Sequence, residues 1–264
     1  RKTKELSYLV SRNSWFKPEM LAKMEPIYFI ARDGTPISGF LTVPVGSNGK
    51  NLPLVVNPHG GPFGPKDDWG YNPDVQILAA NGYAVLQINF RGSGGYGRSF
   101  MHLGYKQWGR TMQDDLTDAT NWAIKEGIAN KNRICMYGAS YGGYSAMVTA
   151  IRWPGRLKCV VSISGASDRV LSFTASDWAR TADGRKLMEA RIGNPNTDMA
   201  DMQRNSPLYR YKELTLPILL VHGREDLRVD YEHTRRLVRM LNLAGHPPAL
   251  IALDDGAKLS KRHG

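Results

Sequence analysis

Short apolar runs alternate with helix-patterned segments along most of this sequence, and this alternation limits the chain to few folds. Strand-like runs lie at residues 52–57, 83–89, 133–137, 159–163, 217–221 and 248–253. Helical patterns lie at residues 74–80, 114–127, 144–151 and 231–242. Because strands that alternate with helices of this length form parallel sheets, we predict an α/β fold with a mostly parallel, doubly wound sheet and helices on both faces.

Two segments depart from this alternation. Residues 26–30 and 37–43 predict a β-hairpin that turns at Arg32-Asp33-Gly34, and the domain is expected to begin near residue 26. Between residues 164 and 217 lies an insertion of mixed helical pattern, rich in polar residues and methionine. An insertion of this kind between two strands is where a lid or pocket wall is expected.

Composition excludes several classes of protein. The 264 residues are 42% hydrophobic and 22% charged, which is typical of one soluble globular domain. No run approaches the roughly 18 apolar residues of a membrane span. The net charge of +11 is spread along the chain, which favours a solvated basic surface over a nucleic-acid site. Cys135 and Cys159 each lie in an apolar run, so we expect buried thiols rather than a disulfide.

The segment with the most chemical meaning is Gly138-Ala139-Ser140-Tyr141-Gly142, which joins the predicted strand 133–137 to the predicted helix 144–151. In this context Gly-x-Ser-x-Gly indicates the nucleophile elbow of the α/β-hydrolase fold. The glycines permit a tight turn that exposes the serine, and the amides at the start of the helix favour developing negative charge. Ser140 is therefore predicted to be a nucleophile that forms an acyl-enzyme.

An acyl-transfer site also requires an oxyanion hole and an acid. His59-Gly60-Gly61-Pro62 follows the strand at 52–57, so we predict that the amides of Gly61 and Tyr141 bind the oxyanion. The acid is expected after a strand that follows the nucleophile, and Glu225 and Asp226 both follow the strand at 217–221. We favour Asp226, although spacing alone does not separate the two.

Taken together, these motifs resemble the catalytic domain of the prolyl oligopeptidase family of serine peptidases, particularly its acylaminoacyl-peptidase and dipeptidyl-peptidase-like branch. The resemblance runs from about residue 26 to residue 256. Beyond the elbow and the oxyanion glycines, it is carried by Asn89-Phe-Arg-Gly-Ser-Gly-Gly-Tyr-Gly97, Ser206-Pro-Leu208 and His222-Gly-Arg-Glu-Asp-Leu-Arg-Val229.

The resemblance implies roles for further residues. It implies that Ser140 is the nucleophile, that Asp226 is the acid of the triad, and that Gly61 and Tyr141 are the oxyanion donors. Arg228 resembles the arginine with which the family binds a substrate carbonyl or carboxylate, and Arg91 is expected to brace loops near the site. Phe173 and Trp178 are candidates for lining the pocket of the residue before the scissile bond.

The chain departs from the family at the histidine. The family places it directly after the last strand in an Asp-x-Gly-His turn, whereas here Gly256 is followed by Ala257. Loss of a triad member lowers turnover by up to about 10⁶-fold. Three explanations stand open: His263 loops back, since six extended residues reach roughly 20 Å; the chain is a peptide-binding pseudoenzyme; or the terminus is altered, truncated or foreign, which is the interpretation we favour.

The tail at 258–264 resembles the nucleotide-binding signature loop of glutamyl-tRNA synthetases, but the chain lacks the matching nucleotide-binding half. Residues 1–25 resemble the linker or exit of an N-terminal β-propeller, and residues 26–257 the catalytic domain.

We therefore predict a serine peptidase for short peptides, with a carboxylesterase as the alternative enzyme. No metal, organic cofactor, nucleic acid or membrane partner is expected; a propeller domain, a homo-oligomer and a cytoplasmic or periplasmic location remain open.

Overall fold

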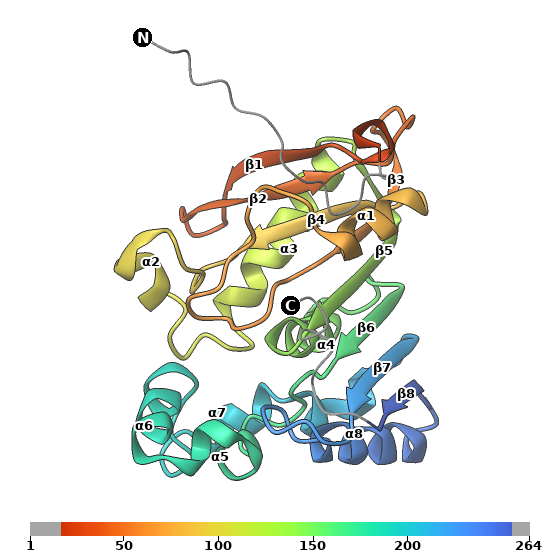
Figure 1. Cartoon of the computed structure of the whole chain (residues 1–264). Helices are drawn as coiled ribbons and strands as arrows, with labels where there is room; N and C mark the ends of the chain where they lie inside the picture. The colour runs from red at the N-terminus through yellow and green to blue at the C-terminus, as the bar shows by residue number, and fades with distance from the viewer. Residues whose placement is uncertain (1–16, 255–264) are drawn as a thin grey trace, which may run out of the picture.

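The computed structural model describes residues 17–254, whose eight strands form one sheet in the order β1-β2-β4-β3-β5-β6-β7-β8 (Figure 1). β2 pairs antiparallel with both β1 and β4, and all other neighbours are parallel, which confirms the predicted mostly parallel sheet. The strands are β1 Met24–Ile30, β2 Pro36–Thr42, β3 Leu52–Val56, β4 Ala84–Asn89, β5 Ala129–Ala139, β6 Cys159–Ile163, β7 Ile218–Gly223 and β8 Ala249–Leu253.

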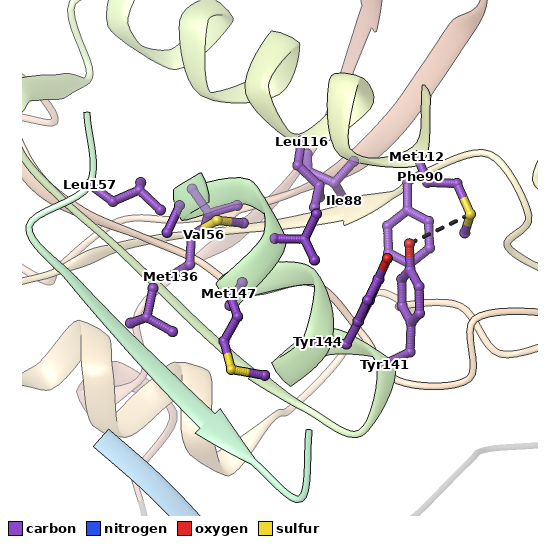
Figure 2. Packing of buried hydrophobic residues seen from close by; sticks show 14 of the residues in the cluster. Val56, Ile88, Phe90, Met112, Leu116, Met136, Tyr141, Tyr144, Met147 and Leu157 are labelled. Carbon is purple, nitrogen blue, oxygen red and sulfur yellow. Dashed lines mark hydrogen bonds between the residues drawn. The ribbon is translucent and has the colours of Figure 1, made fainter. Parts of the chain in front are cut away.

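Helices cover both faces of this sheet, as predicted. Tyr137 of β5 donates a hydrogen bond to Asp74 of α1, whereas the adjacent Met136 points to the other face and lies near Met147 of α4 (Figure 2). The α-helices are α1 Pro73–Ala80, α2 Gly97–His102, α3 Thr111–Lys125, α4 Tyr141–Arg152, α5 Ser172–Ala175, α6 Ala182–Arg191, α7 Met199–Arg204 and α8 Glu232–Leu243. The 3₁₀ helices are η1 Pro18–Met20, η2 Asp177–Arg180 and η3 Pro207–Glu213.

The insertion between β6 and β7 holds α5, η2, α6, α7 and η3, which confirms its expected mixed helical character. α5, α6 and α7 gather at the opposite end of the molecule from β1 (Figure 1). The short helix α2 was not predicted. It begins at a glycine and has no buried residue, so neither helix propensity nor an apolar stripe marks it in the sequence.

Cys135 and Cys159 form a disulfide, so the expectation of free buried thiols is wrong. β5 and β6 are neighbouring parallel strands, and the two cysteines are direct partners in their register, with their Cα atoms 4.8 Å apart. That separation lies within the range that a disulfide bridges. The sequence shows two apolar runs that each contain a cysteine, but only strand pairing sets the cysteines side by side.

The aromatic residues at the start of α4 anchor that helix in the core. Tyr141 and Tyr144 are almost completely buried, and Trp108 lies against both rings at centroid distances of 4.6 and 4.9 Å. The Tyr141 hydroxyl accepts a hydrogen bond from Gln113, and the Tyr144 hydroxyl donates one to the carbonyl of Asn205. Figure 2 shows both rings at the end of α4 that follows Ser140. The helix that supports the predicted nucleophile is therefore fixed by packing and by hydrogen bonds.

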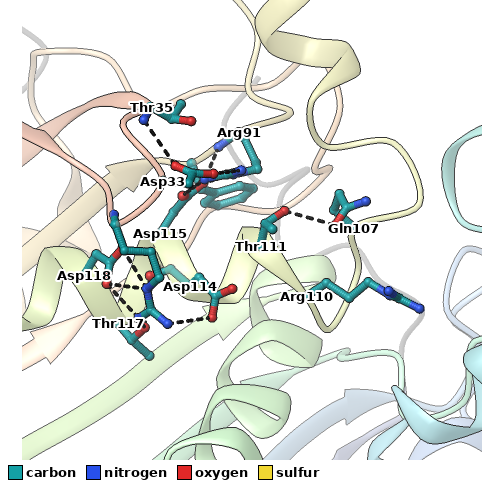
Figure 3. A network of polar contacts seen from close by, with 12 residues as sticks. Asp33, Thr35, Arg91, Gln107, Arg110, Thr111, Asp114, Asp115, Thr117 and Asp118 are labelled. Carbon is teal, nitrogen blue, oxygen red and sulfur yellow. Dashed lines mark hydrogen bonds and ion pairs between the residues drawn. The ribbon is translucent and has the colours of Figure 1, made fainter.

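A buried ion pair joins three elements beside the site (Figure 3). Arg91, directly after β4, donates from Nε and Nη2 to Asp115 of α3 and from Nη1 to Asp33 in the β1–β2 turn. The Arg91 and Asp115 side chains are 6% and 0% exposed. The hydrogen bond from Arg91 also holds the pKa of Asp33 well below its ordinary value. Arg91 thus braces loops, in the way the sequence led us to expect.

Replacing Arg91 with methionine is expected to lower the free energy of unfolding by about 3–5 kcal/mol, because it leaves the Asp115 carboxylate buried without a cation. Arg32→Met is the matched control, since the Arg32 side chain is 53% exposed where it pairs with Asp118. Exposed pairs contribute about 1 kcal/mol or less. Urea denaturation of both variants measures the difference, and equal losses of stability would contradict the assignment.

Candidate active site

Ser140 lies in a strained turn between β5 and α4. Its backbone has φ 56° and ψ −120°, a combination that non-glycine residues adopt only where the surrounding structure imposes it. The Ser140 amide donates a hydrogen bond to the carbonyl of Ile163 in β6 at 2.8 Å, which ties the turn to the sheet. The predicted strand, tight turn and helix are therefore present, and Ser140 occupies the position of the nucleophile in such an elbow.

Glycine is required around Ser140 because main-chain atoms approach closely there, both within the turn itself and between the turn and the loop after β3. A Cβ on Gly142 would lie 2.1 Å from the carbonyl oxygen of Pro58. A Cβ on Gly138 would lie 2.5 Å from the carbonyl carbon of Gly142. The loop after β3 therefore rests directly on the elbow, and a Cβ on Gly60 would lie only 3.6 Å from the Cβ of Ser140.

This contact places two unused amides beside Ser140. Gly61 and Tyr141 line the same pocket as Ser140. Within residues 17–254, neither of their backbone amides donates a hydrogen bond. Tyr141 is the first residue of α4, where amides have no acceptor inside the helix. Both predicted oxyanion donors are thus free to bind a developing negative charge.

His59 holds the loop that carries Gly61. Its Nδ1 donates to the carbonyl of Gly60 at 2.7 Å, its Nε2 lies 2.8 Å from the hydroxyl of Ser93, and its ring stacks on Phe90. Burial lowers the pKa of His59 to about 4. The Ser93 hydroxyl has one proton to donate, and its oxygen lies within hydrogen-bond distance of two acceptors, Nε2 of this neutral ring and the carbonyl of Phe90 at 2.7 Å. His59 therefore acts as a fixed support for the loop.

Asp67 holds the far side of the same loop, although no motif or pattern in the sequence marks it. The Asp67 amide donates to Asn89 of β4, and its Oδ1 accepts from Nε2 of Gln87, also in β4, at 2.7 Å. Asp67 Oδ2 and Gln87 Oε1 are both buried and have no hydrogen-bond partner among the described residues. Burial raises the pKa of Asp67 to about 7, although Gln87 and Lys66 act in the opposite direction.

Replacing Asp67 with asparagine is expected to stabilise the protein at pH 8. The folded protein keeps the Asp67 proton up to about pH 7, whereas the unfolded chain loses it near the ordinary value of 3.8. The folded state therefore binds more protons in this window, and stability falls as pH rises through it. Because asparagine cannot ionise, the variant is expected to have a free energy of unfolding about 2–4 kcal/mol higher than the wild type at pH 8. At pH 4 the free energy of unfolding is expected to be nearly unchanged.

Urea denaturation at pH 4, 6 and 8 measures this effect. Asp68→Asn is the matched control, because the neighbouring Asp68 side chain is 72% exposed and pairs with Lys66. That variant is expected to keep the pH dependence of the wild type. An Asp67→Asn variant that is destabilised equally at all three pH values would show that Asp67 is ionised in the folded protein.

Asp226 lies directly after β7, and burial separates it from Glu225. Asp226 is 4% exposed, whereas Glu225 is exposed to solvent. Its Oδ1 accepts from the amides of Arg228 and Val229 at 2.9 and 3.0 Å, which fixes the carboxylate. Within the described residues, Oδ2 accepts no hydrogen bond, and Nε2 of His222 lies 3.6 Å away. A fixed carboxylate with one free oxygen is suited to orient a histidine.

No histidine within residues 17–254 is placed to act as the general base for Ser140. The histidines within residues 17–254 are His59, His102, His222, His233 and His246, and none of them hydrogen-bonds to Ser140. His222 is bound to Thr234 and to the carbonyl of Val229, and burial lowers its pKa. His233 accepts from the amides of Ser167 and Asp168, and burial lowers its pKa to about 3. Ala257, His263 and the tail at 258–264 lie outside the described residues.

Ser140 opens into a pocket of about 330 Å³ that the insertion helps to enclose. Arg228 and Trp178 line it, and the Arg228 guanidinium lies 4.6 Å from the centre of the Trp178 ring. Nε of Arg228 also pairs with Asp177 at 2.9 Å. Phe173, the other expected pocket residue, is not part of this lining and packs against the hydrophobic core.

Residues 17–254 contain neither a cluster of metal-ligating side chains nor a membrane-spanning helix. None of these residues form a group of three or more histidine, cysteine, aspartate or glutamate side chains placed to hold a metal ion. None of the helices in this part of the chain has the length and apolar character needed to cross a membrane.

Known proteins resemble this chain in sequence and in structure. A family model of the prolyl oligopeptidase family matches residues 69–258. Dipeptidyl aminopeptidase BIII of Pseudoxanthomonas mexicana is 32% identical over 95% of this chain and 37% of its own length. The acylamino-acid-releasing enzyme of Rattus norvegicus is 25% identical over 76% of this chain and 28% of its own length. The chain thus spans about a third of the length of these curated relatives.

Solved structures of acylaminoacyl peptidases also resemble this chain. The Pyrococcus horikoshii acylaminoacyl peptidase superposes with a TM-score of 0.81 at 25% identity, covering 92% of this chain and 38% of that one. An acylaminoacyl peptidase in complex with Z-Gly-Gly-Phe-chloromethyl ketone superposes with a TM-score of 0.82. The sheet and its helices are therefore those of the α/β-hydrolase fold.

Proposed function

The chain belongs to the prolyl oligopeptidase family, and we propose that it is the catalytic domain of a serine peptidase that cleaves short peptides through an acyl-enzyme on Ser140. The observation that carries this proposal is the position of Ser140, in a strained elbow beside two unused amides and at the wall of a pocket. The names of the dipeptidyl and acylaminoacyl peptidases among its relatives support peptides as the substrate class.

In this mechanism Ser140 Oγ attacks the carbonyl carbon of the scissile bond. The carbonyl oxygen becomes negative and accepts hydrogen bonds from the amides of Gly61 and Tyr141. A general base takes the Oγ proton and passes it to the leaving amine, so the peptide bond breaks and an ester on Ser140 remains. Water then attacks the ester by the same steps and releases the acid product.

Asp226 and Arg228 support this chemistry from one loop. The free Oδ2 of Asp226 orients the base and stabilises its cationic form during proton transfer. The base itself falls outside residues 17–254, and His263 is the candidate within this sequence. Arg228 binds a carbonyl or carboxylate of the substrate, and Trp178 holds its guanidinium at the pocket.

The length of the chain relative to its relatives supports a larger protein. We propose that residues 26–257 form the catalytic domain and that residues 1–25 are the linker or exit of a preceding propeller domain. The structure puts the first strand at Met24, and Gln76 of α1 exchanges two hydrogen bonds with Ala22. The contacts of the chain with α1 and with the sheet therefore begin at Ala22 and Met24, before the boundary at residue 26 that the sequence pattern suggested.

A fluorophosphonate probe is expected to modify Ser140 of the intact protein, because only an activated serine reacts with such a probe. Ser140→Ala is expected to lose both the adduct and hydrolysis of an aminoacyl anilide. Ser172→Ala, which changes another serine of the same pocket, is expected to keep the adduct. Mass spectrometry of the labelled peptides reads the outcome.

Two other results would redirect the proposal. Absence of any adduct at Ser140 would favour a peptide-binding pseudoenzyme. An adduct at Ser140 together with hydrolysis of a nitrophenyl ester, but of no anilide or peptide, would favour a carboxylesterase.

Asp226→Asn is expected to lower kcat by about 10⁴-fold, because an asparagine no longer stabilises the cationic base. Glu225→Gln is the matched control and is expected to keep wild-type kcat, since Glu225 is exposed. His263→Ala, measured in the same anilide assay, tests whether His263 is the base. An Asp226→Asn variant with wild-type kcat would show that the triad acid is another residue.

A further inference from the structure

The pocket beside Ser140 contains a second arginine, Arg191, that neither the motifs nor the mechanism uses. Arg191 is the last residue of α6 and lines the pocket together with Phe63 of the loop after β3. Its guanidinium lies over the rings of Phe63 and Tyr105, at 5.4 and 5.8 Å from their centres. These two rings pack edge to face at 5.1 Å and so form one aromatic surface beneath the cation.

Arg191 has no polar partner for its side chain within residues 17–254. It takes part in no ion pair there, and its Nε is buried without a hydrogen-bond acceptor. Its main-chain carbonyl accepts a hydrogen bond from the amide of Lys106. A buried donor without a partner destabilises the folded protein. An acceptor that enters the pocket would offset that destabilisation.

The charges around the pocket do not neutralise Arg191. Arg228, the other cation of the lining, pairs with Asp177, which leaves Arg191 as the cation without a counter-charge among the described lining residues. No aspartate or glutamate of residues 17–254 contributes to the lining, and most of the remaining wall is apolar, including Trp108, Met188 and Ile192. A cation in apolar surroundings exerts a stronger field than one in water. The pocket is therefore complementary to a negatively charged group.

A structural role alone explains the position of Arg191 but not its buried Nε. An arginine in the last turn of a helix interacts favourably with the helix dipole, and a guanidinium above aromatic rings contributes about 0.5–1 kcal/mol at exposed sites. Neither the interaction with the helix dipole nor the cation–π contact requires an acceptor in the pocket. If they were the whole role of Arg191, the pocket would prefer apolar side chains, and removal of the charge would leave that preference unchanged.

We infer that Arg191 selects substrates with a carboxylate side chain at the residue whose carbonyl Ser140 attacks. Ser140, Gly61 and Tyr141 lie at the wall of the same pocket, so a carbonyl bound there directs its own side chain inward. Glutamate or aspartate then reaches the guanidinium, which forms charge-assisted hydrogen bonds with carboxylates. This inference rests on the proposed function, because it assigns the substrate class of that site.

Steady-state kinetics on a matched set of acetyl-aminoacyl anilides tests the inference. The ratio of kcat/KM for the glutamyl substrate to that for the glutaminyl substrate is expected to exceed about 10, since charged hydrogen bonds contribute about 1.5–3 kcal/mol. In Arg191→Met this ratio is expected to fall to 1 or below, and Arg191→Lys is expected to retain part of it. Arg180→Gln, which changes an exposed arginine outside this pocket, is the control and is expected to keep the wild-type ratio.

A binding measurement separates this inference from the proposed function. Trp108 and Trp178 line the pocket, so their fluorescence reports occupation by acetyl-glutamate, acetyl-glutamine or acetyl-leucine in the Ser140→Ala variant. Tighter binding of acetyl-glutamate than of the other two, lost in the Ser140→Ala/Arg191→Met double variant, supports the inference even if no substrate is hydrolysed. Preference for acetyl-leucine, or an acetyl-glutamate preference that Arg191→Met leaves intact, would overturn it.

Discussion

The site depends on the close crossing of two backbones, where the turn around Ser140 meets the loop after β3. Gly142 lies so near the carbonyl of Pro58 that no side chain fits between them. This crossing brings Gly61 to the pocket that Ser140 and Tyr141 also line. Because main-chain atoms make the contact, its geometry is set by the sheet and by α4 rather than by flexible side chains. A preorganised oxyanion site requires donors that do not move during the reaction.

Buried polar groups hold that loop in place from both sides. His59 binds the Gly60 carbonyl and stacks on Phe90, while Asp67 joins the loop to Gln87 in β4. Both groups lie in low-dielectric surroundings that favour their neutral forms. Below about pH 7 the loop is therefore held by uncharged hydrogen bonds, whereas the adjoining elements are joined by the charged pair of Arg91 and Asp115. The insertion then adds the pocket wall, including the arginine that gives the pocket its charge.

Much of the fold and part of the site follow from local sequence. The strand at Cys159–Ile163 was predicted to the residue, and the other strands and the long helices within a few residues, because each has its own apolar period. Ser140 follows from a strand, a turn and a helix that are contiguous in sequence. Asp67 and Arg191 carry no such signal, since an isolated charged residue in a loop or at a helix end reads as solvated surface. Asp67 is covered in part because it meets Gln87 of β4, and Arg191 because it meets Phe63, and both contacts join segments distant in sequence.

The sequence by itself determined the order of strands and helices, the elbow at Ser140, and the family to which the chain belongs. Periodicity and glycine spacing encode these features locally, so no knowledge of long-range contacts is needed. Only the tertiary structure decided that Cys135 and Cys159 are strand partners, that Asp226 rather than Glu225 is buried, and that Arg191 faces the pocket without a counter-charge. Each of these depends on which distant segments become neighbours, and desolvation and charge pairing act only once those neighbours are in place.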